Sequence, residues 1–393
     1  MATFPQNAVP EAVPQVEENR LAWLALALTP GLGPRRILET LRGLDAPGRI
    51  FSLRLTELEG LRLPAHSAQF IFDGKAREAA EEEWRRAQKA QAVLVGYDCP
   101  EYPERLREIY DPPPVLWVRG AVELLGRPSL AIVGTRHPSP YGSGMAEMLA
   151  RDLAARSLLI VSGMARGIDS AAHKGALAAR KPTAAIWGTG VDVVYPKENR
   201  RLADEILALG GAIVSELPLG TFPAPQNFPR RNRMISGISI GVLVVEASEN
   251  SGTRVTARCA AEQSRDLYAV PGNVTNRNSW TPNTLIKQGA KLVATWEDIW
   301  EDLPSQIRIE LEAQAPPEAL SATTASLLME PPLRPEEAMV LEVLRADESR
   351  QTDEILEALE TQLTSSEVFT ALFELELAGR IRCLPGKNYV RTI

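Results

Sequence analysis

The stretch SLAIVGTRHPSPYGSG, residues 129–144, contains an apolar run, an abrupt glycine turn and a helix start. The apolar run predicts a buried strand, and Ser139 followed by Pro140 is typical of a helix N-terminus. In an open α/β sheet, ligands bind where such a strand ends, because unpaired N–H groups and the helix dipole favour an anion there. The stretch therefore predicts an α/β domain with an anion-binding turn.

The turn itself, Gly134-Thr135-Arg136, argues against a dinucleotide cofactor. The G-x-G-x-x-G fingerprint of NAD-binding loops is absent, and Arg136 stands where the second glycine would be. The next predicted strand ends in Ser162-Gly163 rather than in the carboxylate that binds a ribose hydroxyl. Because a guanidinium is a permanently charged, bidentate partner for phosphate, we interpret the turn as a phosphate clamp and expect no cofactor.

Apolar, β-rich runs alternate with helical patterns through the centre of the chain. Continuous Val, Ile and Ala strands separated by helices, such as 141–156 and 199–209, indicate a parallel sheet covered on both faces. The predicted fold class is α/β, with a Rossmann-like, doubly wound and mainly parallel sheet. The predicted strands are 92–97, 115–119, 129–133, 158–161, 183–187, 212–216, 240–246, 267–270 and 291–295.

The flanks of this region predict additional domains. The segment TPGLGPRR at 29–36 separates two helical patterns and resembles half of a helix-hairpin-helix unit, for which we favour a structural or interaction role over DNA contact. Three helical patterns near the C-terminus, followed by two strands around a Pro-Gly-Lys-Asn turn, predict a winged helix. The predicted organisation is a disordered tail at 1–19, a SAM-like helical domain at 20–84, an extended Rossmann-like domain at 85–302, a Pro/Ala/Ser/Glu-rich linker at 303–334 and the winged helix at 335–393.

Charge is unevenly distributed along the chain. Residues 119–296 contain 21 Lys and Arg against 13 Asp and Glu, a net charge of +8, whereas residues 297–380 contain 5 basic and 20 acidic side chains, a net charge of −15. The basic central region suits a polyanion. The three cysteines and three histidines lack disulfide or metal-ligand spacing, so we expect no metal site. With no recognisable signal peptide or membrane-spanning run, we expect a cytoplasmic protein.

Further loops at predicted strand ends carry glycines, arginines or an aromatic ring. They are SGMARGIDSAAH at 162–173, in which we expect Asp169 to cap a helix, GTGVDVVYPKEN at 188–199, NFPRRNRMISG at 227–237 and EASENSGTRVTA at 246–257. Helix ends, arginines and a stacking ring together suit single-stranded nucleic acid, although Phe228 fits core packing equally well. The candidate nucleic-acid-binding residues are Gly134, Thr135, Arg136, Ser162, Gly163, Ala165, Arg166, Phe228, Arg230, Arg231, Asn232, Arg233, Ser251, Gly252 and Thr253.

Together these motifs resemble the DprA/Smf family, the DNA-processing proteins of natural transformation. The matching segments run in order through 131–290: AIVGTRHPSPYG, SGMARGIDSAAH, GTGVDVVYPKENRRL, SELPLG, FPRRNRMISGIS, VVEASENSGTRVTA and AVPGNV with NTLIKQGA. The resemblance implies a single-stranded DNA-binding recombination mediator that protects incoming strands and loads the RecA recombinase onto them. It also implies contact with single-strand-binding protein, a homodimer formed through the Rossmann-like domain, and no catalytic residues.

The resemblance also implies a DNA pocket. Many relatives carry a basic residue just before Phe-Pro, where this chain has PAPQN at 223–227, and Arg230 is the candidate replacement. Carried onto this sequence, the family's pocket uses the Gly134–Arg136 turn, the Ser162–Arg166 loop, and Phe228 with Arg231, Asn232 and Arg233.

The predicted recognition helix of the winged domain is unlike a DNA-reading helix. The segment SSEVFTALFELELAG carries Glu367, Glu374 and Glu376 and no cation, and carboxylates are repelled by a phosphate-lined groove. Arg380, Arg382, Lys387 and Arg391 in the wing remain candidates for DNA contact. We favour a protein-contact role for this domain.

Two other functions remain open. A nucleotide-hydrolysing Rossmann protein of the lysine-decarboxylase-like (LOG) type carries P-G-G-x-G-T-x-x-E, but NSGTRVTA here places Thr256 at the glutamate position. Glu216 and Glu246 at strand ends are the remaining candidate acids, and His173 fits packing better than catalysis. The second alternative is a duplex-DNA regulator that acts through the winged helix.

Overall fold

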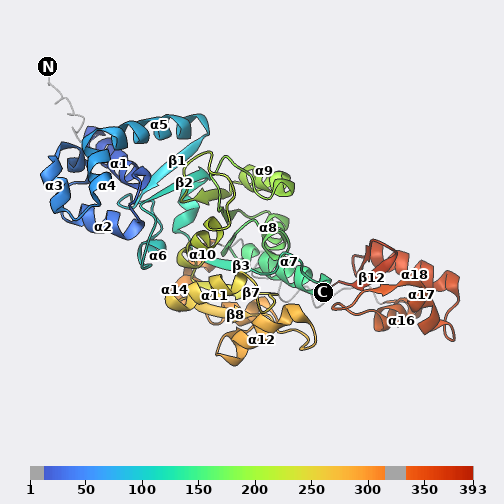
Figure 1. The fold of residues 1–393 in the computed structure, drawn as a ribbon. Coiled ribbons are helices and arrows are strands. Elements are labelled where there is room, and N and C mark those ends of the chain that lie inside the picture. The colour runs from blue at the N-terminus through green and yellow to red at the C-terminus, as the bar shows by residue number, and fades with distance from the viewer. Residues whose placement is uncertain (1–12, 315–332, 393) are drawn as a thin grey trace, which may run out of the picture. The chain divides into compact units, whose positions relative to one another are not determined.

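The computed structural model describes residues 13–314 and 333–392, and the chain divides into two compact units (Figure 1). The first unit contains the chain up to Gly126 together with 187–194 and 212–234. The second contains 127–186, 195–211 and the chain from Ile235 onward. Two central segments thus belong to the unit that the N-terminal residues build, which a division into consecutive sequence domains does not anticipate.

The N-terminal part of the first unit is a helical layer around α1 (Val13–Leu28). Residues 22–26 of α1 are all buried, because α5 (Lys75–Lys89) and η1 (Pro47–Ser52) pack against it. Figure 1 shows α1 beside α5. A helix that is apolar all round is a buried helix, which accounts for the run LAWLALAL. Because α1 begins at Val13, it includes the end of the predicted tail of 1–19, and residues 1–12 lie outside the described residues. The layer is completed by α2 (Pro34–Arg42), α3 (Leu55–Gly60) and α4 (Ala65–Phe72).

A short antiparallel sheet joins the helical layer. Its order is β1-β2-β6, and both pairs are antiparallel. Glu83 on α5 connects helix and sheet: its buried carboxylate accepts hydrogen bonds from the Trp117 indole (3.0 Å) and the Leu219 amide (2.7 Å) and pairs with Arg86 (3.0 Å). These partners offset the cost of burying the charge. The elements are β1 (Ala92–Gly96), α6 (Glu104–Arg107), β2 (Val115–Gly120), η2 (Val122–Gly126), β6 (Ala212–Ser215) and α10 (Asn227–Ile238).

The second unit contains the parallel sheet that the alternating pattern predicts. Its strand order is β5-β4-β3-β7-β8-β9, and the pairs are parallel. All nine predicted strands are present, so the mainly parallel α/β fold is confirmed, with β1, β2 and β6 as its antiparallel part. Strands β3, β4, β5 and β7 are buried along their whole length, as expected when both faces are covered. The bounds are β3 (Ser129–Val133), β4 (Leu159–Ser162), β5 (Thr183–Ile186), β7 (Gly241–Val244), β8 (Asp266–Ala269) and β9 (Lys291–Leu292).

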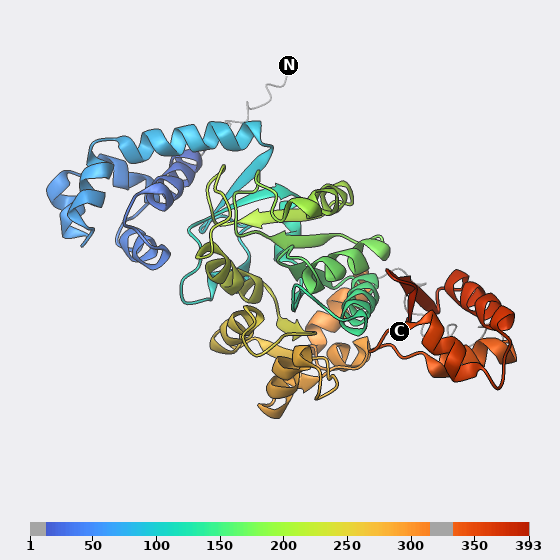
Figure 2. The same ribbon diagram turned by 45° about the vertical axis from the view of Figure 1, so that its right-hand side comes forward.

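Helices of the second unit supply most of its core. α7 and α8 pack against each other (Figure 2), and Leu130, Leu149 and Ile160 are fully buried between helix and sheet. Helix α14 lies inside the predicted linker of 303–334, and the remainder of that prediction, 315–332, falls outside the described residues. The helices are α7 (Pro140–Ala155), α8 (Ile168–Ala178), η3 (Lys197–Asn199), α9 (Arg200–Ala208), α11 (Thr253–Glu262), η4 (Arg277–Ser279), α12 (Trp280–Lys287), α13 (Trp296–Trp300) and α14 (Ser305–Gln314).

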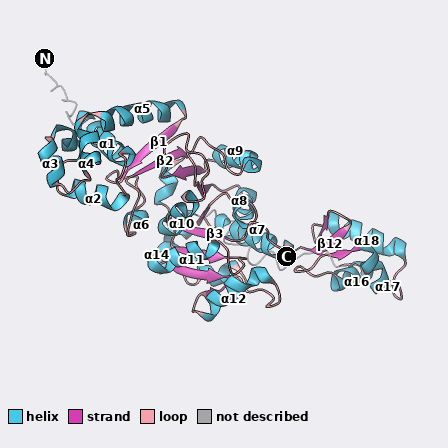
Figure 3. Cartoon of the chain, viewed as in Figure 1, coloured by secondary structure: helices cyan, strands magenta, loops and turns pink. Residues whose placement is uncertain are grey.

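The predicted winged helix is confirmed, and Figure 3 shows its helices and strands. It has a core of its own, which includes Val340, Ile355 and Leu372. Its small sheet has the order β10-β12-β11. The turn of the wing has φ of +85° at Gly386 and +57° at Lys387, the left-handed pair that a tight hairpin requires. The elements are α16 (Pro335–Val343), β10 (Arg350–Gln351), α17 (Thr352–Leu359), α18 (Ser365–Leu377), β11 (Ile381–Leu384) and β12 (Asn388–Arg391).

Candidate nucleic-acid interface

The strand order places a topological switch point between β3 and β7. From β3 the chain winds outward through β4 and β5, and from β7 it winds the opposite way through β8 and β9. In open α/β sheets the loops at such a point diverge and leave a crevice that binds ligands. The loops here are the Gly134–Arg136 turn after β3 and residues 245–252 after β7, and the Ser162–Arg166 loop follows the neighbouring β4. Three predicted loops therefore share one edge of the sheet.

The turn after β3 is held by close backbone contacts. A Cβ at Gly134 would lie 2.5 Å from Cγ1 of Ile168 and 2.8 Å from the carbonyl oxygen of Glu246, so glycine is required. The Thr135 amide donates to the Glu246 carbonyl (2.6 Å), and the Thr135 carbonyl accepts from the Ile168 amide (3.2 Å). The turn is thus fixed between β7 and α8, and Arg136 follows it as an exposed side chain.

The N-terminus of α7 already holds an anion, and that anion is a side chain of the protein. The carboxylate of Glu246, which is 2% exposed, accepts hydrogen bonds from the Ser139 amide (2.8 Å) and the Ser139 hydroxyl. A Cβ at Gly142 would lie 2.4 Å from the Glu246 carboxyl carbon, so this glycine makes room for the carboxylate. The expectation that this helix start is open to a phosphate is therefore wrong, because Glu246 occupies the position that the helix dipole favours.

The Ser162–Arg166 loop is held by hydrogen bonds from within the unit. Asp169 is 5% exposed, and its carboxylate accepts from the amides of Gly163 (3.2 Å) and Ala165 (3.3 Å). The Ser162 hydroxyl donates to the Ile132 carbonyl on β3 (2.6 Å). These polar groups order the loop, so a ligand would meet its outer surface rather than these atoms.

Two details of this loop differ from the sequence expectation or refine it. Helix α8 begins at Ile168 after Gly167, and Asp169 orders the preceding loop instead of capping the helix. Arg166 is exposed and forms an ion pair with Glu198, and both side chains are more than half exposed. Such a surface pair contributes about 0–1 kcal/mol, so Arg166 can exchange Glu198 for a phosphate at small cost.

Helix α10 carries the second group of predicted residues, and these belong to the first unit. Phe228 is half-buried and packs on Gly188, where a Cβ would lie 2.9 Å from the Phe228 ring. Asn232, one turn further along the helix, is also half-buried. The sequence allows Phe228 either to pack in the core or to stack on a base, and the contact with Gly188 favours packing.

The arginines of α10 differ strongly in burial. The side chain of Arg233 is 10% exposed, pairs with Glu216 and with Asp111 (3.2 Å), and donates to the Asp111 carbonyl (2.6 Å). Arg231 is 6% exposed. Arg230 is exposed and lies 3.4 Å from the Glu216 carboxylate. Arg230 is therefore the arginine of α10 that is best placed to meet a phosphate, whereas Arg233 fastens the helix to the loop before β2.

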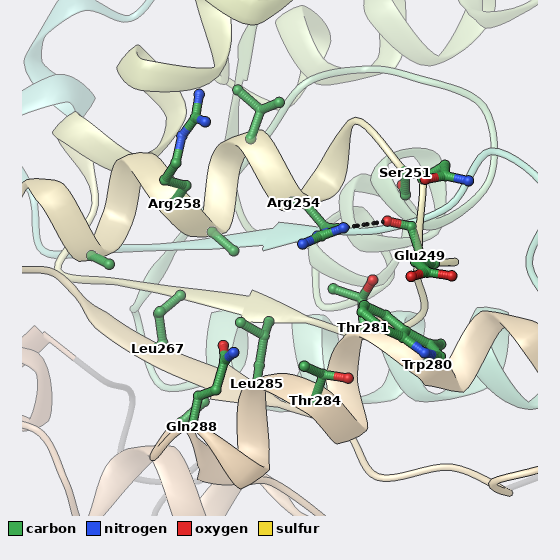
Figure 4. Close-up of a pocket in the computed structure, with 15 residues that line it drawn as sticks. Glu249, Ser251, Arg254, Arg258, Leu267, Trp280, Thr281, Thr284, Leu285 and Gln288 are labelled. Carbon is green, nitrogen blue, oxygen red and sulfur yellow. Dashed lines mark hydrogen bonds between the residues drawn. The ribbon is translucent and has the colours of Figure 1, made fainter.

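A pocket of about 620 Å³ opens beside the Ser251–Thr253 loop, between α11 and α12 (Figure 4). At its rim the Ser251 hydroxyl accepts from the Thr253 amide (3.2 Å), and Arg254 donates to the Glu249 carbonyl (2.8 Å). The Arg254 guanidinium lies 5.3 Å from the ring centroid of Trp280, which is 39% exposed. The lining also includes Arg258, Val255, Leu267 and Leu285.

The sequence reasoning missed Arg254, Arg258 and Trp280. Arginines four residues apart in a predicted helix share one face, so the spacing of Arg254 and Arg258 was a usable signal. Trp280 is the first residue of a different helix, α12, and the contact between α11 and α12 is tertiary. The sequence alone therefore could not show that Arg254, Arg258 and Trp280 lie together in one pocket.

Groups that were considered for catalysis or metal binding have structural partners. His173 is fully buried, with Nδ1 2.8 Å from the Thr183 hydroxyl, and Thr256 is 2% exposed. Glu216 pairs with Arg233, and Glu246 holds the start of α7. Within residues 13–314 and 333–392, no cluster of His, Cys, Asp and Glu side chains has the makings of a metal site. In the same ranges, no helix combines the length and the apolar character needed to cross a bilayer.

Comparisons with known proteins place the chain in a family. A family model described as DNA recombination-mediator protein A matches residues 93–304, and one described as DprA winged helix domain matches residues 312–387. Protein Smf from Escherichia coli (strain K12) is 42% identical over 301 residues, which cover 76% of this chain and 77% of that protein. DNA processing protein DprA from Streptococcus pneumoniae is 37% identical over 270 residues, which cover 68% of this chain and 93% of that protein.

A solved structure shows the same fold. The X-ray structure of DNA processing protein A from Streptococcus pneumoniae aligns with a TM-score of 0.63 and 33% sequence identity, over 73% of this chain and 98% of that one. The family model spans more than half of the present chain, and the strand-end motifs lie inside its match. On these grounds the chain belongs to the DNA recombination-mediator protein A family, that of the DprA and Smf proteins.

Proposed function

We propose that this recombination mediator binds single-stranded DNA at the carboxyl edge of its parallel sheet, with Arg136 as the central phosphate contact. The observation that carries the proposal is the exposed position of Arg136 on a turn that Gly134 fixes at the switch point. Arg166 follows the neighbouring strand and is also exposed. Guanidiniums at successive strand ends suit a run of phosphodiesters, whose binding does not depend on base sequence.

The site favours a strand over a free nucleotide. A terminal phosphate is usually held by the amides of a helix start, and at α7 Glu246 takes that position. A phosphodiester carries one charge and needs no such cradle. The pocket between α11 and α12, with Arg254 beside Trp280, extends the basic and aromatic surface beyond the Ser251 loop.

The later steps of the proposed function follow from the family resemblance. The bound strand is passed to RecA, single-strand-binding protein is displaced, and a homodimer forms through the Rossmann-like domain. The winged helix serves as a protein contact: α18 exposes Phe369, Phe373 and Leu377 at 51%, 64% and 76%, four residues apart along one face. An apolar, acidic helix face suits a protein partner better than a phosphate groove.

The test is Arg136→Ala, measured as fluorescence anisotropy of a labelled oligonucleotide over a salt series. Loss of one phosphate contact lowers the log–log slope of affinity against salt by about 0.7 for a single strand and weakens binding to all sequences alike. Arg151→Ala is the matched control, because Arg151 is an exposed arginine near the opposite end of α7. An unchanged slope in Arg136→Ala would remove Arg136 from the interface.

The same protein preparation separates the alternatives. We expect single-stranded oligonucleotides to outcompete duplexes, and nucleoside monophosphates to remain intact on incubation. Preference for duplex would favour the winged-helix regulator. Release of free base would favour the LOG-type hydrolase. RecA loading is tested by RecA ATPase activity on DNA coated with single-strand-binding protein, which wild type should accelerate and Arg136→Ala should not.

A further inference from the structure

Tyr110 is an unusually exposed aromatic side chain in the loop between α6 and β2. Its exposure is 76%, although the preceding Ile109 is buried at 6%. The guanidinium of Arg35, from α2, lies 4.5 Å from the ring centroid. The chain therefore holds an aromatic ring in solvent with a cation against it, a combination that accepts nucleobases by stacking.

The loop that carries Tyr110 is tied directly to α10. Arg233 donates to the Asp111 carbonyl (2.6 Å) and pairs with the Asp111 carboxylate (3.2 Å). Arg230, the exposed cation of the proposed interface, lies one turn before Arg233 on the same helix. In Figure 1 the loop after α6 accordingly lies between α2 and α10. The residue next to Tyr110 is thus bound to the helix that carries Arg230.

Two of the acidic side chains near Tyr110 have arginine partners. Glu39 and Asp111 are each paired with an arginine, Glu39 with Arg35 (3.0 Å) and Asp111 with Arg233 (3.2 Å). Arg36, next to Arg35 on α2, is exposed and donates to the Arg62 carbonyl (3.0 Å). Arg35 of α2 therefore lies against the ring, and Arg233 of α10 pairs with the residue that follows Tyr110.

We propose that Tyr110 and Arg35 form a base-stacking platform for single-stranded DNA, contributed by the first unit. The platform rests on the proposed function and deepens it: an unpaired nucleobase stacks on Tyr110 while Arg35 and Arg36 meet adjacent phosphates. Paired bases in a duplex do not offer their faces, so the platform selects single strands. The platform assigns a role in DNA binding to the segment TPGLGPRR, because its two arginines lie in the first turn of α2 and contact the strand through their side chains.

The experiment compares Tyr110→Ala, Tyr110→Phe and Arg35→Ala in the full chain, with labelled oligonucleotides of increasing length. Phe72→Ala is the matched control, because Phe72 is an aromatic residue of α4 that is 53% exposed. Stacking of one base contributes about 1–3 kcal/mol, so Tyr110→Ala should weaken binding of long oligonucleotides by about 5- to 150-fold. Tyr110→Phe keeps the ring and should bind as wild type does.

The outcomes separate the two proposals. If wild type binds no single strand of any length, the proposed function itself is wrong. If wild type binds and Tyr110→Ala matches it at every length, the platform is wrong while the proposed function stands. Photocrosslinking of an oligonucleotide that contains 5-iodouracil gives a second readout, and a crosslink at Tyr110 that disappears in Tyr110→Ala supports the platform directly.

Discussion

At the scale of single residues, Glu246 decides what the turn after β3 can bind. The sequence of that turn is typical of phosphate-binding loops, and the helix start would attract an anion. Glu246 follows β7, more than a hundred residues later in the chain, and satisfies the Ser139 amide and hydroxyl. The remaining attraction for a phosphate comes from Arg136, a charge on a side chain rather than a helix dipole.

Gly142→Ala tests this arrangement. Alanine is favoured over glycine in a helix by about 1 kcal/mol, but here its Cβ would lie 2.4 Å from the Glu246 carboxyl carbon. We expect the overlap to prevail and to lower the free energy of unfolding by about 1–3 kcal/mol, measured by urea denaturation. Gly126→Ala is the control, because its added Cβ meets no atom within 4 Å. A Gly142→Ala protein as stable as wild type would show that Glu246 can move aside.

At the scale of elements, the arginines of α10 have different roles: Arg233 stabilises the fold, and Arg230 is proposed to contact DNA. Arg233→Ala leaves Glu216, whose side chain is 4% exposed, without its buried partner. Loss of one member of a buried ion pair costs about 3–5 kcal/mol, so this variant should unfold at markedly lower urea concentration. Arg230→Ala removes an exposed charge and should change stability by less than about 1 kcal/mol while weakening DNA binding. If Arg233→Ala is as stable as wild type, the structural role of Arg233 is wrong, and Arg233 is again a candidate for DNA contact.

The strands were predictable as elements because strands that are buried on both faces consist of continuous runs of Val, Ile and Ala. The winged helix was predictable for a similar reason, since its Pro-Gly-Lys-Asn turn lies between two short strand patterns. The start of α1 at Val13 was not predicted, because residues 17–20 of α1 are polar and read as part of the tail, whereas in the structure Glu18 pairs with Arg77 of α5 (2.8 Å). Helix α14 was not predicted, because it lies in a segment whose prolines are typical of a linker. Its Leu311 is nevertheless fully buried.

At the scale of the whole molecule, the C-terminal region carries much of the acidity. Residues 315–393 contain 7 basic and 14 acidic side chains, so a chain that ends at Gln314 has 36 of each and a net charge of zero instead of −7. The winged helix has a separate core, and its removal leaves the core around the parallel sheet intact. We expect the truncated protein to bind single-stranded DNA at least as tightly as wild type. Any gain in affinity should appear only at low salt, because salt screens the charge that the truncation removes.

Anisotropy titrations at low and high salt check this expectation, and circular dichroism confirms folding of the truncated chain. A loss of more than about tenfold in affinity, or about 1.4 kcal/mol, would show that the winged helix contributes to single-strand binding. RecA loading by the truncated chain is the companion measurement, since a protein-contact role for α18 predicts that loading fails while DNA binding persists.

The sequence by itself determined the α/β fold, the winged helix, the loops at the strand ends and the arginine of the first turn. Each of these is encoded locally, in periodicity, turn chemistry or charge. Only the tertiary structure decided which polar groups are satisfied within the protein: Glu246 at α7, Asp169 in the loop after β4 and Arg233 beside Glu216. It also placed Arg35 against Tyr110. The physical reason is that desolvation and pairing depend on residues that are distant in the chain, which local patterns do not record.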